Sequence, residues 1–459
     1  MKPALMLLMA GAAFLWAQNV KLPQYTRETL PNGAVVLLMP RAGVPLVHFR
    51  ILVKGGVEAE SPQTAGLAGL TAQLLRKGSS KRTSDQFAEQ LDFLGGTLVS
   101  QQQGSFTSIT AEFLKKDFDA GLDLLADATL RPTFPADEVR KEIARRVDGI
   151  KSAKDNPQQA ISQYFQPAFF GRQHPYGNPP DESTLARIQR ADLVDYHAKL
   201  YRGPNLIVAV TGDFDPAAAK AKLAQTFGAA QSGDAYRWKP SPTLVRRSQL
   251  VLIDKPDATQ TYFLIAQPGI DRANPHRVPI ELVNTLFGGR FTSMLNEELR
   301  VSTGLTYGAS SMVRESRLQG PIIISTYTKT ETTTRAIDLA LEILKRLNEK
   351  GITAEQLASV KAYEKGTYPT QSLETIDQLA NTIADLEFYG LRRDDVDGRF
   401  AQIDAVTLSE ANAVAKKYFR SNDLTFVVLG ASEKIREQLK KYDPKPVELS
   451  AKDPGWGER

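Results

Sequence analysis

The chain has 459 residues, and its content of 42% hydrophobic and 24% charged residues is typical of globular proteins that fold in water. The length predicts about two to four domains. The net charge of +5 is spread along the chain without a block of Lys and Arg, which argues against a nucleic-acid-binding protein, and the lack of Cys excludes disulfides, thiolate metal sites and a Cys nucleophile.

The first 17 residues are typical of a secretory signal peptide. An early Lys2 is followed by an apolar run from Ala4 to Trp16 and by a small residue, Ala17, at which cleavage can occur. The run is too short for a membrane-spanning helix, which needs roughly 18 apolar residues. We expect an exported, periplasmic protein with no stable membrane insertion after cleavage; an uncleaved N-terminal anchor is the alternative.

The segments that follow alternate between strands and helices. Residues 33–40 and 45–54 are apolar, β-branched runs separated by a short turn, which predicts an antiparallel hairpin. A helix is expected to begin at a capping Ser84, and the alternating residues 97–114 after it predict further strands. This order favours α+β domains with helices packed on one face of a largely antiparallel sheet.

Between these segments, the helix expected in GLAGLTAQLLRKG, residues 66–78, has an unusual face. Leucines supply its apolar stripe, whereas Gly69, Ala72 and Gln73 lie side by side at positions i, i+3 and i+4. A Gly inside a helix costs roughly 1 kcal/mol relative to Ala. The small, uncharged face therefore needs an explanation.

An internal repeat divides the chain into two domains. The segment that begins at Leu200 resembles the one that begins at Tyr418, and FPADEVRKE at Phe134 resembles ITAEQLASV at Ile352, with the same offset of 218 residues in both cases. We expect domains at residues 18–230 and 248–445, a polar, Pro-bearing linker at 231–247 and a tail at 446–459.

The most informative motif of the second domain is residues 286–311, LFGGRFTSMLNEELRVSTGLTYGASS. Gly288 and Gly289 predict a loop that another chain, such as a peptide substrate, can approach closely. Arg300 and Tyr307 flank the turn from a helix to a strand. A cation and a phenol aimed at a carbonyl is one interpretation; an Arg at a helix C-terminus and a Tyr at the core edge is the other.

These motifs resemble those of the M16 (insulinase/pitrilysin-like) peptidases of the two-domain, processing-peptidase-like class, over residues 25–440. In that family the first domain carries the zinc motif H-x-x-E-H within G-L-A-H-x-x-E-H-x-x-x-K-G. Here the positions of the first His, the Glu and the second His hold Gly69, Ala72 and Gln73. The resemblance implies two tandem LuxS/MPP-like metallohydrolase-fold domains.

The resemblance also places the third zinc ligand, a Glu seven positions after another Glu on a helix. Glu142 stands at the earlier position, whereas Gly149 stands at the ligand position with Asp148 beside it. No cofactor is therefore expected on this chain, since a catalytic zinc site keeps three strong protein ligands. The family's LR-x-x-x-x-GL-x-Y pattern is intact, and the resemblance implies a catalytic role for Arg300 and Tyr307.

A lost zinc motif with a retained Arg/Tyr pair predicts the non-zinc subunit of a heterodimeric M16 metallopeptidase. Its partner would be an M16 chain with an intact H-x-x-E-H that holds the zinc, and its substrates would be peptides or unfolded proteins bound in extended form. The alternatives are a catalytically inactive structural or peptide-binding protein and a Ser hydrolase, for which no nucleophile elbow is found. The sequence does not decide between a heterodimer and a homodimer.

Overall fold

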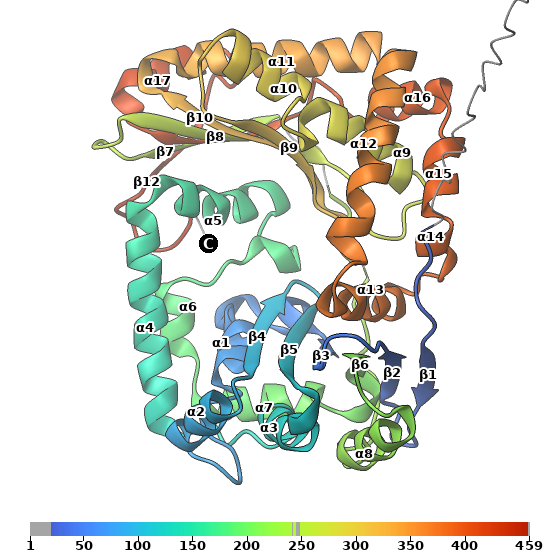
Figure 1. Cartoon of the computed structure of the whole chain (residues 1–459). Coiled ribbons are helices and arrows are strands. Elements are labelled where there is room, and N and C mark those ends of the chain that lie inside the picture. Colours follow the sequence, from blue (N-terminus) through green and yellow to red (C-terminus); the bar gives the residue numbers. More distant parts are fainter. Residues whose placement is uncertain (1–19, 241, 245–247, 458–459) are drawn as a thin grey trace, which may run out of the picture.

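Two six-stranded sheets, one in each half of the chain, form the framework of this computed structural model (Figure 1). The structure describes residues 20–457 except 241 and 245–247, so the expected signal peptide at residues 1–17 lies outside the described residues. Among the described helices, none combines the length and the apolar character needed to cross a membrane.

The first sheet has the strand order β1-β2-β6-β3-β5-β4. Its strands are β1 (Thr26–Thr29), β2 (Val35–Pro40), β3 (Leu46–Lys54), β4 (Thr97–Gln103), β5 (Phe106–Leu114) and β6 (Leu206–Gly212). The expected hairpin of residues 33–40 and 45–54 is wrong, because β6 lies between β2 and β3, parallel to the first and antiparallel to the second. Continuous apolar runs mark strands buried on both faces, but they do not identify the neighbouring strand.

The second sheet repeats this arrangement in the order β12-β7-β11-β8-β10-β9. Its strands are β7 (Gln249–Asp254), β8 (Gln260–Pro268), β9 (Ala309–Val313), β10 (Pro321–Lys329), β11 (Thr425–Gly430) and β12 (Val447–Ser450). β12 is parallel to β7. The expected tail at residues 446–459 therefore contributes an edge strand of the second sheet.

Each sheet is covered on one face by helices of its own half, as the sequence predicts. In the first half these are α1 (Leu67–Leu74), α2 (Ser84–Phe93), α3 (Phe118–Leu130), α7 (Arg190–Leu200) and α8 (Pro216–Gly228). In the second half they are α9 (Arg277–Asn284), α11 (Thr333–Lys350), α12 (Ala354–Ser372), α16 (Leu408–Tyr418) and α17 (Ser432–Leu439). The residue that caps α2 is Thr83 rather than the expected Ser84: its hydroxyl accepts from the Gln86 N–H.

The opposite face of each sheet is covered by a helix from the other half (Figure 1). α5 (Pro157–Phe170), which follows the long α4 (Ala136–Asp155), packs on β8 and β11 of the second sheet. α13 (Ile376–Tyr389), which follows α12, packs on β3 and β6 of the first sheet. The repeat thus predicts matching helices, and the two halves exchange one helix each.

Shorter helices complete each half. They are α6 (Glu182–Arg187), α10 (Met294–Asn296), α14 (Asp394–Asp397), α15 (Arg399–Ala405) and the π-helical turns η6 (Thr285–Gly289) and η7 (Glu297–Ser302). η6, α10 and η7 correspond to the glycine-bearing loop and the helix expected in residues 286–302. Gly288 and Gly289 thus lie in a helical turn and not in an open loop.

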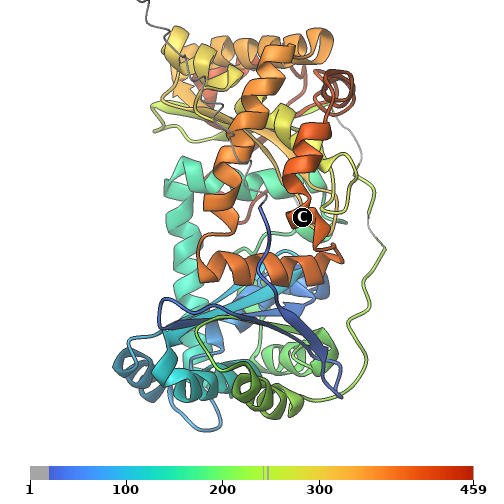
Figure 2. The ribbon, with the colours of Figure 1, turned by 45° about the vertical axis from the view of Figure 1, so that its right-hand side comes forward.

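Within the expected linker, residues 231–247, the described residues 231–240 and 242–244 run along the outside of the first half toward the second (Figure 2). Its aromatic residues fix it there. The Tyr236 N–H donates to Asn205 Oδ1 at 2.6 Å, and the Tyr236 hydroxyl donates to the Glu58 carbonyl at 2.8 Å. The ring of Trp238 lies 4.2 Å from the guanidinium of Arg317, which also pairs with the buried Glu58 carboxylate and so links the two halves.

Trp456 is the residue by which the C-terminal segment holds both halves together. It is 2% exposed, its indole N–H donates to the Pro180 carbonyl at 2.8 Å, and its ring meets Tyr164 of α5 edge-on at 5.1 Å. Lys154 of α4 lies 5.2 Å above the ring. The end of the chain therefore belongs to the packed interior between the second sheet and α5.

We predict that Trp456→Ala lowers the free energy of unfolding by about 3–5 kcal/mol, because a large buried ring is removed and the site cannot collapse. Urea denaturation monitored by circular dichroism measures the change. Lys452→Ala, an exposed position in the same segment, is the matched control and should shift stability by less than about 0.5 kcal/mol. Equal stabilities for the two variants would contradict this role for the C-terminal segment.

Candidate functional site

The helix that carries the small face, α1, is fixed at its N-terminus by a buried carboxylate. Glu60 accepts hydrogen bonds from the N–H groups of Gly66 at 3.1 Å and Ala68 at 2.5 Å, which are otherwise unpaired at a helix start. Burial raises the pKa of Glu60 to about 7. On the next turn, the Ser100 hydroxyl of β4 donates to the Ala72 carbonyl at 2.5 Å, so α1 is held against the edge strand of the first sheet.

An arginine of α4 fills the space above Gly69. A Cβ placed on Gly69 would lie 3.2 Å from Nη1 of Arg146, and Nη2 of the same guanidinium donates to the Gly69 carbonyl at 2.8 Å. Nε of Arg146 donates to Glu142 at 3.1 Å. A side chain longer than hydrogen at position 69 would thus need Arg146 to move. This contact explains why a helix interior tolerates Gly here.

The other positions that the family resemblance assigns to the zinc site also lack the His and Glu side chains of that motif. Ala72 is fully buried against β4, and Gln73 is partly buried on α1. Gly149 is exposed on α4, where a Cβ would meet no atom within 4 Å, and the neighbouring Asp148 carboxylate pairs with Lys151 at 3.4 Å. Within the described ranges, no cluster of three or more His, Asp or Glu side chains could hold a metal ion. The residues present do not fit zinc.

Glu142 stands at the position of the Glu that precedes the family's third zinc ligand by seven residues. Its carboxylate is shared between two arginines. It accepts from Nε of Arg145 at 2.9 Å and from Nη2 of Arg145 at 2.5 Å, in addition to its bond from Arg146. Partial burial opposes the ionisation of Glu142, but the two guanidinium groups outweigh it and lower the pKa of the carboxyl. One carboxylate facing two guanidinium groups leaves this cluster with a net positive charge.

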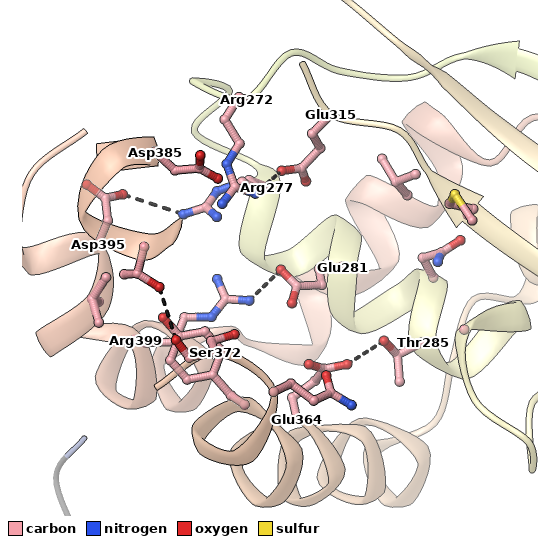
Figure 3. A pocket seen from close by; sticks show the side chains of 18 of the residues that line it. Arg272, Arg277, Glu281, Thr285, Glu315, Glu364, Ser372, Asp385, Asp395 and Arg399 are labelled. Carbon is pink, nitrogen blue, oxygen red and sulfur yellow. Dashed lines mark hydrogen bonds and ion pairs between the residues drawn. The ribbon is translucent and has the colours of Figure 1, made fainter. Parts of the chain in front are cut away.

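Two adjoining cavities lie on either side of the end of β9. The smaller, of about 750 Å³, is lined by Gly69 and Arg146 of the first half and by Arg314 and Ser316 of the second. The larger, of about 780 Å³, lies in the second half (Figure 3). Val313 and Glu315 line both cavities, so the end of β9 forms the wall between them.

The larger cavity is lined by charged side chains that neutralise one another (Figure 3). Its ion pairs are Arg272–Glu315 at 2.7 Å, Arg277–Asp395 at 3.5 Å and the short Arg399–Glu281 contact. Glu364 accepts from the Thr285 hydroxyl at 2.5 Å, and burial raises the pKa of this carboxyl. Three arginines thus face five carboxylates, one of which, Asp385, pairs with Arg50 of β3 at 3.6 Å, so the described lining of the larger cavity offers no unpaired positive charge to a ligand.

Gly288 and Gly289 line this larger cavity. Gly288 is buried, and a Cβ there would overlap the backbone nitrogen and the Cβ of Ser311 in β9. The close approach that Gly288 permits is therefore to a strand of its own domain. Gly289 has more room, with Asn284 and Thr285 at 3.3–3.4 Å from the position of a Cβ.

Arg300 and Tyr307 lie outside both cavities. Arg300, on η7, has its guanidinium 4.7 Å from the ring of Phe291, and Tyr307, which precedes β9, is 79% exposed. Neither side chain has a hydrogen-bond or ion-pair partner among the described residues. Phe291, Val301 and Met312 are also exposed and lie in the same stretch of chain, which gives this part of the second half an unusual share of exposed apolar residues.

His174 and Asp213, two further polar residues of the first half, have structural contacts. Nδ1 of the buried His174 accepts from the Tyr176 N–H at 3.0 Å and so closes the turn that follows it. Asp213 pairs with Lys115 at 2.7 Å at the end of β6. Arg146 and Arg314, which line the smaller cavity, are not among the residues predicted from the sequence. The spacing of four between Glu142 and Arg146 on a helix is the signal that could have indicated the first of these.

Comparisons with known proteins identify the chain. A family model described as "Insulinase (Peptidase family M16)" matches residues 35–179, and one described as "Peptidase M16 inactive domain" matches residues 187–363. The chain belongs to the M16 peptidase family. The first range lies in the first half, and the second runs from the end of α6 in the first half into α12 of the second. Together with the two matching sheets, they confirm the tandem M16 fold predicted from the sequence.

M16 relatives of this chain include proteins described as proteases and as inactive. It is 26% identical over 394 residues to an uncharacterized zinc protease of Mycobacterium leprae, covering 85% of this chain and 88% of the relative. It is 25% identical over 396 residues to the non-peptidase homolog YmxG of Helicobacter pylori, covering 85% and 90%. The crystal structure of a peptidase M16 inactive domain from Pseudomonas fluorescens superposes with a TM-score of 0.83 at 24% identity, covering 89% and 98%.

We predict that restoring Gly69→His, Ala72→Glu, Gln73→His and Gly149→Glu together does not restore zinc binding while Arg146 is present, because its guanidinium fills the space above residue 69 and repels a cation. Adding Arg146→Val should raise bound zinc toward one ion per chain. Metal content by mass spectrometry after dialysis against zinc-free buffer measures both. Stoichiometric zinc in the fourfold variant would show that Arg146 does not block the site.

Proposed function

We propose that this chain is the non-zinc subunit of a heterodimeric M16 metallopeptidase. It would bind extended peptide substrate and supply Arg300 and Tyr307 to a zinc site held by a partner M16 chain with an intact H-x-x-E-H. The observation that carries the proposal is that Tyr307 is 79% exposed and that neither it nor Arg300 is bonded within the described part of the chain. Such side chains are free to act on another subunit.

The chemistry of the pair suits peptide hydrolysis. A guanidinium N–H and a phenol O–H can both donate to the oxyanion that develops when water attacks a peptide carbonyl, and each such donor contributes about 3 kcal/mol in a site that excludes water. The exposed Phe291, Val301 and Met312 near them provide apolar area for contact with a partner. A role in metalloendopeptidase activity would thus depend on the assembled pair of subunits.

Binding of the substrate is supported by the edges of the two sheets. β4 and β9 are edge strands of their sheets. Residues of both strands line the smaller cavity, and further residues of β9 line the larger. An extended peptide can add to an exposed sheet edge through its main-chain hydrogen bonds. Gly289, at the wall of the larger cavity, leaves space for a peptide backbone. Export to the periplasm, proposed from residues 1–17, would bring the chain to unfolded or fragmented proteins.

A catalytically inactive peptide-binding or structural protein is the second candidate. Two observations favour it. Arg146 lies over Gly69, the residue at the expected position of the first zinc ligand, and the Helicobacter and Pseudomonas proteins are described as non-peptidase and inactive. On this alternative, Arg300 and Tyr307 would serve only the surface of the second domain. The two candidates differ in whether these side chains affect the rate of a reaction.

We predict that Arg300→Ala and Tyr307→Phe each lower the turnover of a quenched fluorescent peptide by about 10²–10³-fold when the zinc-bearing partner is present, because each removes one donor to the oxyanion. The partner is to be obtained by co-purification from the source cell and recognised by its H-x-x-E-H. Arg335→Ala, an exposed arginine on α11, is the matched control and should leave turnover unchanged. Unchanged rates in both site variants would favour the inactive protein.

A further inference from the structure

The smaller cavity brings together two arginines from different halves of the chain. Arg146 comes from α4, and Arg314 directly follows β9. The cavity holds about 750 Å³, which is enough for several residues of a peptide. Its charge therefore depends on how far these two guanidinium groups are neutralised by their neighbours.

Arg146 has donor capacity left for a ligand. Its Nε and Nη2 bond to Glu142 and to the Gly69 carbonyl, whereas Nη1 has no hydrogen-bond partner within the described residues. Glu142 is shared with Arg145, so the three side chains carry one net positive charge. The guanidinium side chain is 23% exposed, on the wall that faces the cavity.

The positive charge of Arg314 is offset by even fewer acidic groups than that of Arg146. Its side chain has neither a hydrogen bond nor an ion pair to any residue that the structure describes, and loss of solvent is what lowers its pKa. It stays protonated at neutral pH, as arginines do. Arg314 is nevertheless an exposed residue, so its donors are open to a ligand, and an anion in the cavity would gain charge-assisted hydrogen bonds from it.

The acidic residues of the cavity are engaged elsewhere. Glu60 accepts two backbone N–H bonds at the start of α1, and its pKa of about 7 leaves it partly neutral at physiological pH. Glu315 is paired with Arg272 at 2.7 Å. Glu60 also attracts Arg146 across the cavity, which leaves Arg314 as the guanidinium that no carboxylate of the cavity offsets.

The remaining walls suit a peptide backbone. Gln102 and Gln103 belong to β4, the edge strand of the first sheet, and Phe170 and Tyr176 provide aromatic surface. An extended chain paired with β4 would run past Arg146. We propose that this cavity binds the carboxylate of an extended peptide, with Arg146, which fills the space of a lost metal ligand, and Arg314 as the two donors to its oxygens.

That the ligand is a peptide rests on the proposed function, whereas the carboxylate rests on the two arginines. The test uses the isolated mature chain and three fluorescein-labelled octapeptides of the same neutral sequence. One has a free C-terminal carboxylate, one a C-terminal amide, and one a C-terminal amide with a single internal Glu. Fluorescence anisotropy at low salt measures their Kd values.

We expect the free acid to bind at least about tenfold more tightly than the plain amide, because charge-assisted hydrogen bonds are lost with the amide. If the Glu-bearing amide binds as tightly as the free acid, the site takes side-chain carboxylates as well; if it binds like the plain amide, the site selects the C-terminus. Equal Kd values for all three peptides would overturn the proposal.

Variants locate the site. Arg314→Gln, at an exposed position without partners, and Arg146→Gln should each remove most of the difference between acid and amide. Arg145→Gln is the matched control, since Arg145 also bonds to Glu142 but does not line the cavity. A difference that survives in both Arg314→Gln and Arg146→Gln would place carboxylate binding elsewhere and overturn the proposal.

The result is separate from the test of the subunit role. Carboxylate binding is measured without a partner, and Arg300→Ala and Tyr307→Phe should leave it unchanged, because neither side chain lines the cavity. A chain whose Arg300 variants keep full turnover with the partner could still bind carboxylates. A chain that binds acid and amide equally could still supply Arg300 and Tyr307.

Discussion

Each half of this molecule needs one helix of the other half to bury its sheet. Each sheet has a second apolar face that its own half leaves uncovered, and α5 and α13 cover these faces in trans, so neither half can bury its strands alone. This exchange of helices fixes α4 and α12 between the sheets (Figure 1). It thereby encloses the two cavities and sets α4 against α1.

With α4 held in this way, one side chain decides the chemistry of the first domain. Arg146 lies on Gly69, bonds to its carbonyl and shares Glu142 with Arg145. If Gly69 stands at the position of the family's first zinc ligand, as the sequence motif predicts, a fixed positive charge takes the place of a metal cation. The cavity can therefore keep an attraction for the carbonyl and carboxylate oxygens of peptides without the means to activate water, which accords with a chain that binds but does not cleave alone.

Much of this molecule could be predicted from its sequence, and the failures have physical reasons. The repeat predicts two like domains because hydrophobic pattern and turn residues recur at a fixed offset. The pairing of β2 with β6 and the entry of residues 447–450 into the second sheet are long-range choices that local pattern does not encode. The motif around Gly69 predicts that a zinc ligand is missing, but the direction of the Arg146 side chain follows from the packing of α4 on α1. The spacing of Arg300 and Tyr307 in the sequence does not predict how exposed their side chains are.

If Arg146 stands where related chains hold zinc, the unaltered protein has no catalytic metal of its own. Zinc content by mass spectrometry and peptide cleavage, both measured on protein purified without chelator, decide this. We expect well below one zinc per chain and no cleavage by the isolated chain. One tightly bound zinc per chain, with cleavage that a chelator abolishes, would contradict this expectation.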